Sequence, residues 1–281
     1  MSSTPESKTA RIMESNKATV VKNIANDRGS ALGFDDDGAA ELARVPGKKC
    51  GYCAFSRNQW TASAVSSPCA EFDCTKVKRR RLAKHGSLAR EGDKLANLYS
   101  LRFGQLKAIG GKNAEQQVSG FYLPGDLIGL ESIATGHHRF RLLALENCEV
   151  CEIPTSALAG LIAQHPEFQT SLIMAFSGAL NDQYSRSVIL SMRSLERRFA
   201  GFLLGLGQRY AHLGYSGNSF RLGMTRGDIG SYLATSIESI SRLISRFNGC
   251  GVTLIQGRMV DLVNRPYLEA LVRGDRELHG P

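Results

Sequence analysis

Short runs of alternating apolar and polar residues, punctuated by glycine, fill the middle of the chain. Two such runs, at 99–103 and 106–110, are separated by Gly104 and predict two strands joined as a hairpin. Further strand-and-turn units follow between residues 121 and 153. Many short strands of this kind predict a compact antiparallel β-roll over residues 75–165.

The hydrophobic period changes from two to about 3.6 after Pro154. A short helix is predicted at 155–165 and a long helix at 166–192. The long helix carries one apolar stripe, which includes Ile173, Phe176, Leu180 and Tyr184. Such a stripe is typical either of a core face or of the seam of a dimer. Because a helix that connects two domains has few neighbours in its own chain, we expect the stripe to form the seam of a homodimer.

Residues 225–248 predict two helices separated by a tight turn. Thr225 is a suitable N-cap for the first helix, with Asp228 three residues later. A turn at Ala234 then leads to Ser236, which can cap the second helix. The segment therefore predicts a short helix, a turn and a longer helix.

The second helix has an apolar face and a polar face. Its apolar residues recur at helical spacing and are Ile237, Ile240, Ile244 and Phe247. The opposite face carries Glu238, Ser241, Arg242 and Ser245. With a predicted hairpin at 252–262, this layout indicates a winged helix-turn-helix domain over residues 193–281. The expected fold class is α+β: a β-roll, a long dimerisation helix and a C-terminal winged helix-turn-helix.

The polar face of that helix suits recognition of double-stranded DNA. Arginine can donate two hydrogen bonds to guanine, and glutamate can accept one from cytosine. The candidate DNA contacts are Thr225, Arg226, Ser236, Glu238, Ser241, Arg242 and Ser245. The alternative is an ordinary helical hairpin in which Glu238 and Arg242 form a surface ion pair.

Charge and hydropathy favour a polyanionic partner and argue against a membrane protein. The 281 residues carry 35 Lys and Arg against 26 Asp and Glu, a formal net charge of +9, which suits nucleic acid. No apolar run approaches the roughly 18–20 residues that span a bilayer, and the polar N-terminus does not resemble a signal peptide. We therefore expect a cytoplasmic protein without membrane contact, in which residues 1–48 form a mostly disordered leader.

Seven unevenly spaced cysteines are the other candidate chemistry. Four of them crowd into the irregular segment 49–74, namely Cys50, Cys53, Cys69 and Cys74. Cys148 and Cys151 form a second pair in a predicted strand, where an odd separation places them on opposite faces. A reducing compartment disfavours disulfides, so the thiols are interpreted as metal ligands, redox-active groups or buried apolar residues.

The segment Met224–Gly230, together with Glu238–Arg242, resembles the recognition segment of the FNR branch of the CRP/FNR bacterial transcription regulators. The resemblance covers roughly residues 75–265 and includes Cys151–Pro154. It implies a cyclic-nucleotide-binding-type β-roll and a homodimer that binds palindromic DNA and acts on RNA polymerase. Glu238, Ser241 and Arg242 match the family residues that read a TTGAT-type half-site. The family commonly has glycine where this chain has Ala234.

The same resemblance implies an oxygen-labile [4Fe-4S] cluster, because proteins of the FNR branch hold one with three N-terminal cysteines and one cysteine of the β-roll. Cys151 matches the β-roll ligand, and Cys50 and Cys53 match two of the N-terminal ligands. The third family cysteine is absent from residues 54–60, so Cys69 or Cys74 has to replace it. Cys69 is preferred because its irregular surroundings leave it free to fold back.

Three other interpretations compete with the iron-sulfur hypothesis. Cyclic AMP receptors carry an Arg-Ser or Arg-Thr pair in their phosphate cassette, whereas this chain has Arg139-Phe140, so we do not expect it to bind cAMP. A structural zinc site would also use four thiolates. A thiol-redox enzyme built on Cys50 and Cys53 is the least favoured, since the surroundings are polar and irregular. The basic run Lys76–Arg81 is expected at an edge of the β-roll.

Overall fold

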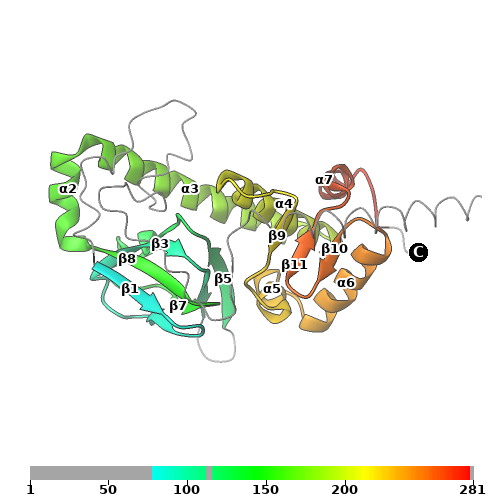
Figure 1. The fold of residues 1–281 in the computed structure, drawn as a ribbon, viewed down its shortest axis with the longest axis horizontal. Coiled ribbons are helices and arrows are strands. Elements are labelled where there is room, and N and C mark those ends of the chain that lie inside the picture. The colour runs from blue at the N-terminus through cyan, green and yellow to red at the C-terminus, as the bar shows by residue number, and fades with distance from the viewer. Residues whose placement is uncertain (1–77, 112–115, 279–281) are drawn as a thin grey trace, which may run out of the picture. The chain divides into compact units, whose positions relative to one another are not determined.

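The computed structural model of this chain describes residues 78–111 and 116–278 (Figure 1). The predicted leader at 1–48 and the cysteine segment at 49–74 lie outside the described residues. The strands before Thr155 form two four-stranded antiparallel sheets. The first has the order β1 (Lys78–Leu82), β8 (Cys148–Pro154), β3 (Asn97–Phe103) and β6 (Leu127–Ile128). The second has the order β2 (Ser87–Ala89), β7 (Arg141–Ala144), β4 (Leu106–Gly110) and β5 (Gln117–Tyr122).

The expected hairpin between 99–103 and 106–110 is wrong, although both strands exist. β3 pairs with β8 and β6, whereas β4 pairs with β5 and β7 in the other sheet. Gly104 has a φ of 84°, and a Cβ there would lie 2.5 Å from the carbonyl oxygen of Asn147. The chain can therefore turn sharply at Gly104 and cross from one sheet to the other, which a side chain at this position would obstruct.

The inner faces of the two sheets enclose one apolar core. Its largest buried members include Leu101 and Leu106 from the two sides of the crossing turn and Leu142 from β7. Cys148 and Val150 of β8 also belong to this core. β1, which contains four residues of the basic run, is an edge strand of the first sheet, as expected. Charged residues on an exposed edge discourage pairing with other chains.

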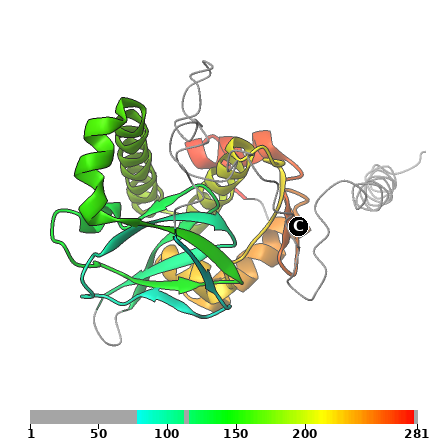
Figure 2. The ribbon, with the colours of Figure 1, turned by 60° about the vertical axis from the view of Figure 1, so that its left-hand side comes forward.

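The helices that follow the sheets begin with two short elements and a long helix. They are η4 (Thr155–Ala157), α2 (Leu158–Gln164) and α3 (Pro166–Ser191), while η3 (Leu130–Ser132) lies between β6 and β7. Phe168 and Leu172 near the start of α3 are buried against Leu98 and Ile153 on the outer face of the first sheet. Both views accordingly show α2 and α3 beside the sheets (Figures 1 and 2).

The C-terminal part combines helices with a small sheet, as a winged helix-turn-helix requires. Its helices are α4 (Leu195–His212), α5 (Arg226–Tyr232), α6 (Ile237–Gly249) and α7 (Arg265–Arg273). The strands β9 (Ser219–Arg221), β10 (Leu254–Gln256) and β11 (Met259–Asp261) form an antiparallel sheet of order β10-β11-β9. Phe199 of α4 and Phe247 of α6 are fully buried in its core and meet edge to face. The predicted α+β fold class is thus confirmed.

None of the helices in residues 78–111 and 116–278 combines the length and the hydropathy that a membrane span needs.

Candidate functional site

The first helix of the helix-turn-helix, α5, begins with the cap that the sequence predicts. The Thr225 hydroxyl accepts a hydrogen bond from the Asp228 backbone amide at 3.1 Å, and the Asp228 carboxylate accepts one from the Thr225 amide at 2.9 Å. This reciprocal capping box satisfies two amides that a helix start otherwise leaves without partners. The start of α5 is therefore fixed by local hydrogen bonds.

Asp228 is buried and carries a second interaction, because Lys107 of β4 donates a hydrogen bond to its carboxylate. Burial by itself raises the pKa of the Asp228 carboxyl, but the hydrogen bonds from Lys107 and Thr225 outweigh burial and hold the pKa below its ordinary value. The carboxylate is therefore ionised at neutral pH and stabilises the folded form.

Replacing Asp228 by asparagine is expected to lower the free energy of unfolding at pH 7 by about 1.5–3 kcal/mol, the usual worth of hydrogen bonds to a charged group. A lowered folded-state pKa contributes stability above the unfolded value of about 4 and loses it as the pH falls through the folded value. Urea unfolding of both proteins from pH 7 to pH 3 should therefore show the difference shrinking below about pH 4. The exposed Asp275→Asn is the control, and a difference that stays constant across this range would contradict the assignment.

The turn between α5 and α6 contains a backbone conformation that usually selects glycine. Ala234 has a φ of 53°, in the left-handed region. A Cβ on Gly230 would lie 2.9 Å from the Thr235 carbonyl oxygen, so glycine at 230 lets the turn fold back onto α5. Thr235 then donates its amide to the Gly230 carbonyl at 2.9 Å. The change from the family glycine to Ala234 is accommodated without losing the turn.

The second helix, α6, buries one face and exposes the other. Ser236 caps it by accepting a hydrogen bond from the Ser239 amide at 3.1 Å. The buried residues are Ile240, Leu243, Ile244 and Phe247. Ile237, which we expected on the buried face, is 48% exposed. It is the first residue of the helix and lies beyond the core that Ile240 enters, so the helical spacing alone assigned it wrongly.

The seven predicted DNA contacts lie at the start of α5 and along α6. All are exposed except Ser241, which is half-buried and accepts a hydrogen bond from Arg226 at 3.4 Å. Hydrogen bonds from its own backbone amide and from Ser236 lower the pKa of the Glu238 carboxyl, so Glu238 is an ionised acceptor at neutral pH. The exposed face thus offers a carboxylate, a guanidinium and hydroxyls, the groups that read base edges and phosphates.

The strand β8 places its two cysteines on opposite faces, as expected. Cys148 faces the core between the sheets, where burial raises the pKa of its thiol to about 11. Its sulfur donates to the carbonyl oxygens of Gln105 and Glu146 at 3.2 and 3.1 Å. Cys151 is also buried but lies on the outer face with Ile153. Cys148 is therefore a packing residue, and Cys151 is the thiol on the side where α3 packs.

The remaining predicted ligands, Cys50, Cys53, Cys69 and the alternative Cys74, lie outside the described residues. Over residues 78–111 and 116–278, no group of three or more His, Cys, Asp and Glu side chains is placed to hold a metal ion. Cys250 is half-buried against the core of the C-terminal domain. A metal site that uses Cys151 therefore has to take other ligands from outside the described part of the chain.

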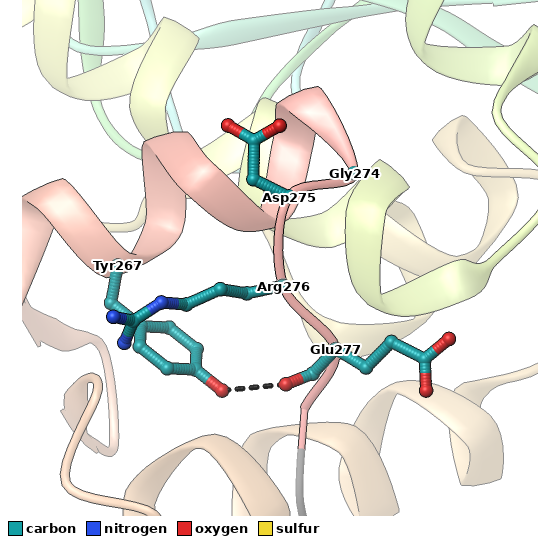
Figure 3. A pocket seen from close by; sticks show the side chains of 5 residues that line it. All are labelled: Tyr267, Gly274, Asp275, Arg276 and Glu277. Carbon is teal, nitrogen blue, oxygen red and sulfur yellow. Dashed lines mark hydrogen bonds between the residues drawn. The ribbon is translucent and has the colours of Figure 1, made fainter.

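A hollow of about 420 Å³ lies after α7, lined by Tyr267 and residues 274–277 (Figure 3). The Tyr267 hydroxyl donates to the Glu277 carbonyl at 2.7 Å, and the Arg276 guanidinium lies 5.3 Å from the centre of the Tyr267 ring. These contacts hold the C-terminal segment against α7, and Leu278 beyond it is buried in the domain core. None of the predicted site residues lines this hollow.

The geometry defines a class of protein: a β-sandwich domain joined by a long helix to a winged helix-turn-helix of the kind that binds DNA. Residues 79–165 match the family model of the cyclic nucleotide-binding domain, and residues 197–271 match that of the Crp-like helix-turn-helix domain. The Fumarate and nitrate reduction regulatory protein of Salmonella typhimurium is 36% identical over 202 residues, which cover 72% of this chain and 81% of that protein. Its counterpart in Escherichia coli K12 is 35% identical with the same coverage.

Solved structures agree with this comparison. FixK2 from Bradyrhizobium japonicum is 25% identical with a TM-score of 0.63, and the match covers 69% of this chain and 96% of FixK2. A CooA variant from Carboxydothermus hydrogenoformans is 16% identical with a TM-score of 0.58 over 71% of this chain and 89% of CooA, and shows the shared fold. The chain belongs to the CRP/FNR family of transcription regulators, on its FNR branch. Proteins of this family are DNA-binding regulators and not enzymes.

Proposed function

We propose that this protein is an oxygen-responsive transcription regulator that binds a TTGAT-type palindrome as a homodimer under the control of a [4Fe-4S] cluster. The observation that carries the proposal is the place of Cys151 on β8. Ile153, the next residue on the same face, packs with Phe168 and Leu172 of α3. A structural change at the Cys151 thiol can therefore reach α3, the helix that leads to the DNA-binding domain, through the packing of Ile153 on Phe168 and Leu172.

Among the described residues, one cysteine, Cys151, is a candidate ligand of the proposed cluster. Thiolates are the usual ligands of [4Fe-4S] clusters, and four are needed. Cys151 would supply one, and Cys50, Cys53 and Cys69, or Cys74 in place of Cys69, would supply the others. When bound, the cluster would supply a group that oxygen destroys. The chain itself holds the Cys151 sulfur on a rigid strand, largely shielded from water, next to the packing of α3.

The spectrum and metal content of protein purified without oxygen test this proposal. A broad visible absorption that bleaches in air, with about four iron atoms and acid-labile sulfide per chain, is the expected result. A colourless protein with stoichiometric zinc would support the structural zinc site instead. A colourless protein without metal that still binds the palindrome would leave DNA binding intact and overturn oxygen sensing.

The outward face of α3 supports the proposed homodimer. Leu180 and Tyr184 are 69% and 72% exposed, and Ile173 and Val188 are exposed on the same helix. Phe176 is partly buried against the cluster that contains Leu172, so the start of the stripe also serves the core of this chain. Exposed large apolar residues in a row are typical of an interface rather than of a monomer surface.

Leu180→Glu is expected to convert the proposed dimer into a monomer, because it places a charge in the middle of an apolar seam. Sedimentation or light scattering should show the mass halved, and palindrome binding should fall sharply because one subunit retains only one half-site. Ser185→Glu, on another side of α3, is the matched control and should leave the mass unchanged. A Leu180→Glu protein that remains dimeric would contradict the proposed seam.

Cyclic AMP remains an unfavoured effector. Phe140 packs against the core between the sheets, and a Cβ on Gly110 would lie 2.8 Å from the Phe140 ring. The aromatic ring thus packs beside the second sheet, and position 140 offers no hydroxyl to a cyclic phosphate. The family also implies RNA polymerase as a partner. A regulator that contacts DNA and RNA polymerase is expected in the cytoplasm.

A further inference from the structure

The β4–β5 side of the sensor packs directly on the DNA-binding domain. Val118 and Phe121 of β5 belong to the same buried cluster as Leu233 and the α6 core residues. The Phe121 ring lies 5.2 Å from the ring of Tyr232 at the end of α5. Figures 1 and 2 show β5 next to α5. The first helix of the helix-turn-helix is therefore packed against the sensor within one chain.

Within the described residues, three ion pairs cross between the two domains, and one of them joins Glu146, in the turn before β8, to Arg221 of β9 at 2.8 Å. Lys107 of β4 binds Asp228, the residue that also closes the α5 capping box, and both side chains are largely buried. Asp126, in the turn after β5, binds Arg209 of α4. Arg209 also donates to the Phe121 carbonyl at 3.0 Å and lies 3.8 Å from Asp182 of α3. One guanidinium thus joins the sensor, the long helix and the DNA-binding domain.

Hydrogen bonds between side chains and backbone groups also cross the contact. The Val118 amide donates to the Ser231 hydroxyl at 2.9 Å, and Arg186 of α3 donates to the Val118 carbonyl at 3.1 Å. The buried Gln105 side chain accepts from the Gly223 amide at 3.1 Å. A Cβ on Gly223 would lie 2.1 Å from the Gln105 oxygen, so glycine is what permits this approach. We call this set of polar contacts between the two domains the interdomain seam, as distinct from the dimer seam on α3. It comprises the ion pairs Lys107–Asp228 and Asp126–Arg209 and the hydrogen bonds Val118–Ser231 and Gln105–Gly223.

Hydrogen bonds are directional, so the largely buried ones of the interdomain seam fix the orientation of the DNA-binding domain relative to the β-sandwich as well as its distance. A dimer engages two half-sites at once only when both recognition helices are held at the separation and orientation of the DNA. We infer that the interdomain seam orients α6 for this purpose, so that Lys107 and Asp126 of the sensor are positioning residues for DNA binding. The inference rests on the proposed two-site dimer.

The test compares two DNA probes with the full-length protein prepared without oxygen. Lys107→Met, Asp126→Asn and the double variant are titrated with a TTGAT-type palindrome and with a duplex in which one half-site is scrambled. Lys84→Met, an exposed lysine of the same domain, is the control. The double variant is expected to lose on the order of tenfold or more in affinity for the palindrome, with half-site affinity unchanged, because only simultaneous engagement depends on orientation.

The exchange rates of backbone amides measure whether the interdomain seam is formed, without any DNA present. The Val118 and Gly223 amides, both donors in the seam, should be protected in the wild-type protein and exchange on the order of tenfold faster in the double variant, while the α6 core amides remain unchanged. Equal losses on both probes, or wild-type Val118 and Gly223 amides as fast as exposed ones, would overturn the inference. A wild-type protein without preference for the palindrome would instead contradict the proposed dimer, and the exchange of these two amides would still decide whether the seam forms.

Discussion

Cys151→Ser is expected to abolish the response to oxygen while leaving the protein folded. Serine has nearly the same shape as cysteine, and position 151 is outside the apolar clusters that stabilise the sensor. A hydroxyl is a poor ligand for iron in an iron-sulfur cluster, whereas a thiolate is the usual one. Protein purified without oxygen should therefore lack the visible absorption and stoichiometric iron, and its DNA binding should be the same before and after exposure to air.

Cys148→Ser is the matched control for that experiment. It lies three residues away on the same strand but faces the core between the sheets, with a thiol whose pKa burial raises to about 11. This variant should keep the iron and the response to oxygen and lose only a little stability, since the serine hydroxyl can donate to the same Gln105 and Glu146 carbonyls that the thiol contacts. A Cys151→Ser protein that still responds to oxygen like wild type, or a Cys148→Ser protein that loses its iron, would refute the assignment of Cys151.

Arg242→Ala is expected to produce the largest loss of DNA affinity among single substitutions. One bidentate contact with a base is worth about 1–3 kcal/mol. A homodimer loses this contact in both half-sites. Because losses at separate positions are roughly additive, binding to the palindrome should weaken by about 2–6 kcal/mol. Discrimination should also relax at one base position of each half-site, which a competition assay with single-base variants of the palindrome measures.

A control variant and one alternative outcome test this role of Arg242. Arg273→Ala, which removes an exposed arginine of α7 that pairs with Asp275, is the control and should leave affinity nearly unchanged. If Arg242→Ala weakens binding to every sequence equally and reduces the salt dependence, then Arg242 contacts a phosphate rather than a base.

Local signals explain why the helix-turn-helix was predictable from the sequence. Thr225 and Ser236 cap the helices that they precede, and each cap depends on residues only three positions apart. The period of α6 likewise separates its faces within one helix. The error at Ile237 arose because periodicity gives the direction of a side chain but not where the core ends.

Contacts between distant segments were not predictable in the same way. The apparent hairpin at 99–110 divides between two sheets because strand partners are chosen across the sandwich, with β8 lying about fifty residues beyond β3. The seam residues Lys107 and Asp228 are 121 positions apart, and neither carries a motif that relates it to the other. The interdomain seam therefore emerges only when the fold brings β4 and α5 together.

The candidate site likewise has one part that local sequence predicts and one part that depends on contacts between distant segments. The predicted DNA contacts follow from caps and helical spacing, and in the structure all of them are exposed except the half-buried Ser241. The cluster ligands depend on joining segment 49–74 to β8, and the structure describes only the Cys151 end of that connection. The choice between Cys69 and Cys74 therefore stays a prediction, to be tested by replacing each with serine.

The central claim is that oxygen controls DNA binding through a cluster held partly by Cys151. The most direct measurement is the affinity of wild-type protein, purified without oxygen, for a TTGAT-type palindrome before and after exposure to air, with iron and sulfide counted in the same samples. We predict tight binding that is lost in air together with the iron. Binding that is equally tight in both samples, or an iron-free protein that binds tightly throughout, would contradict the claim.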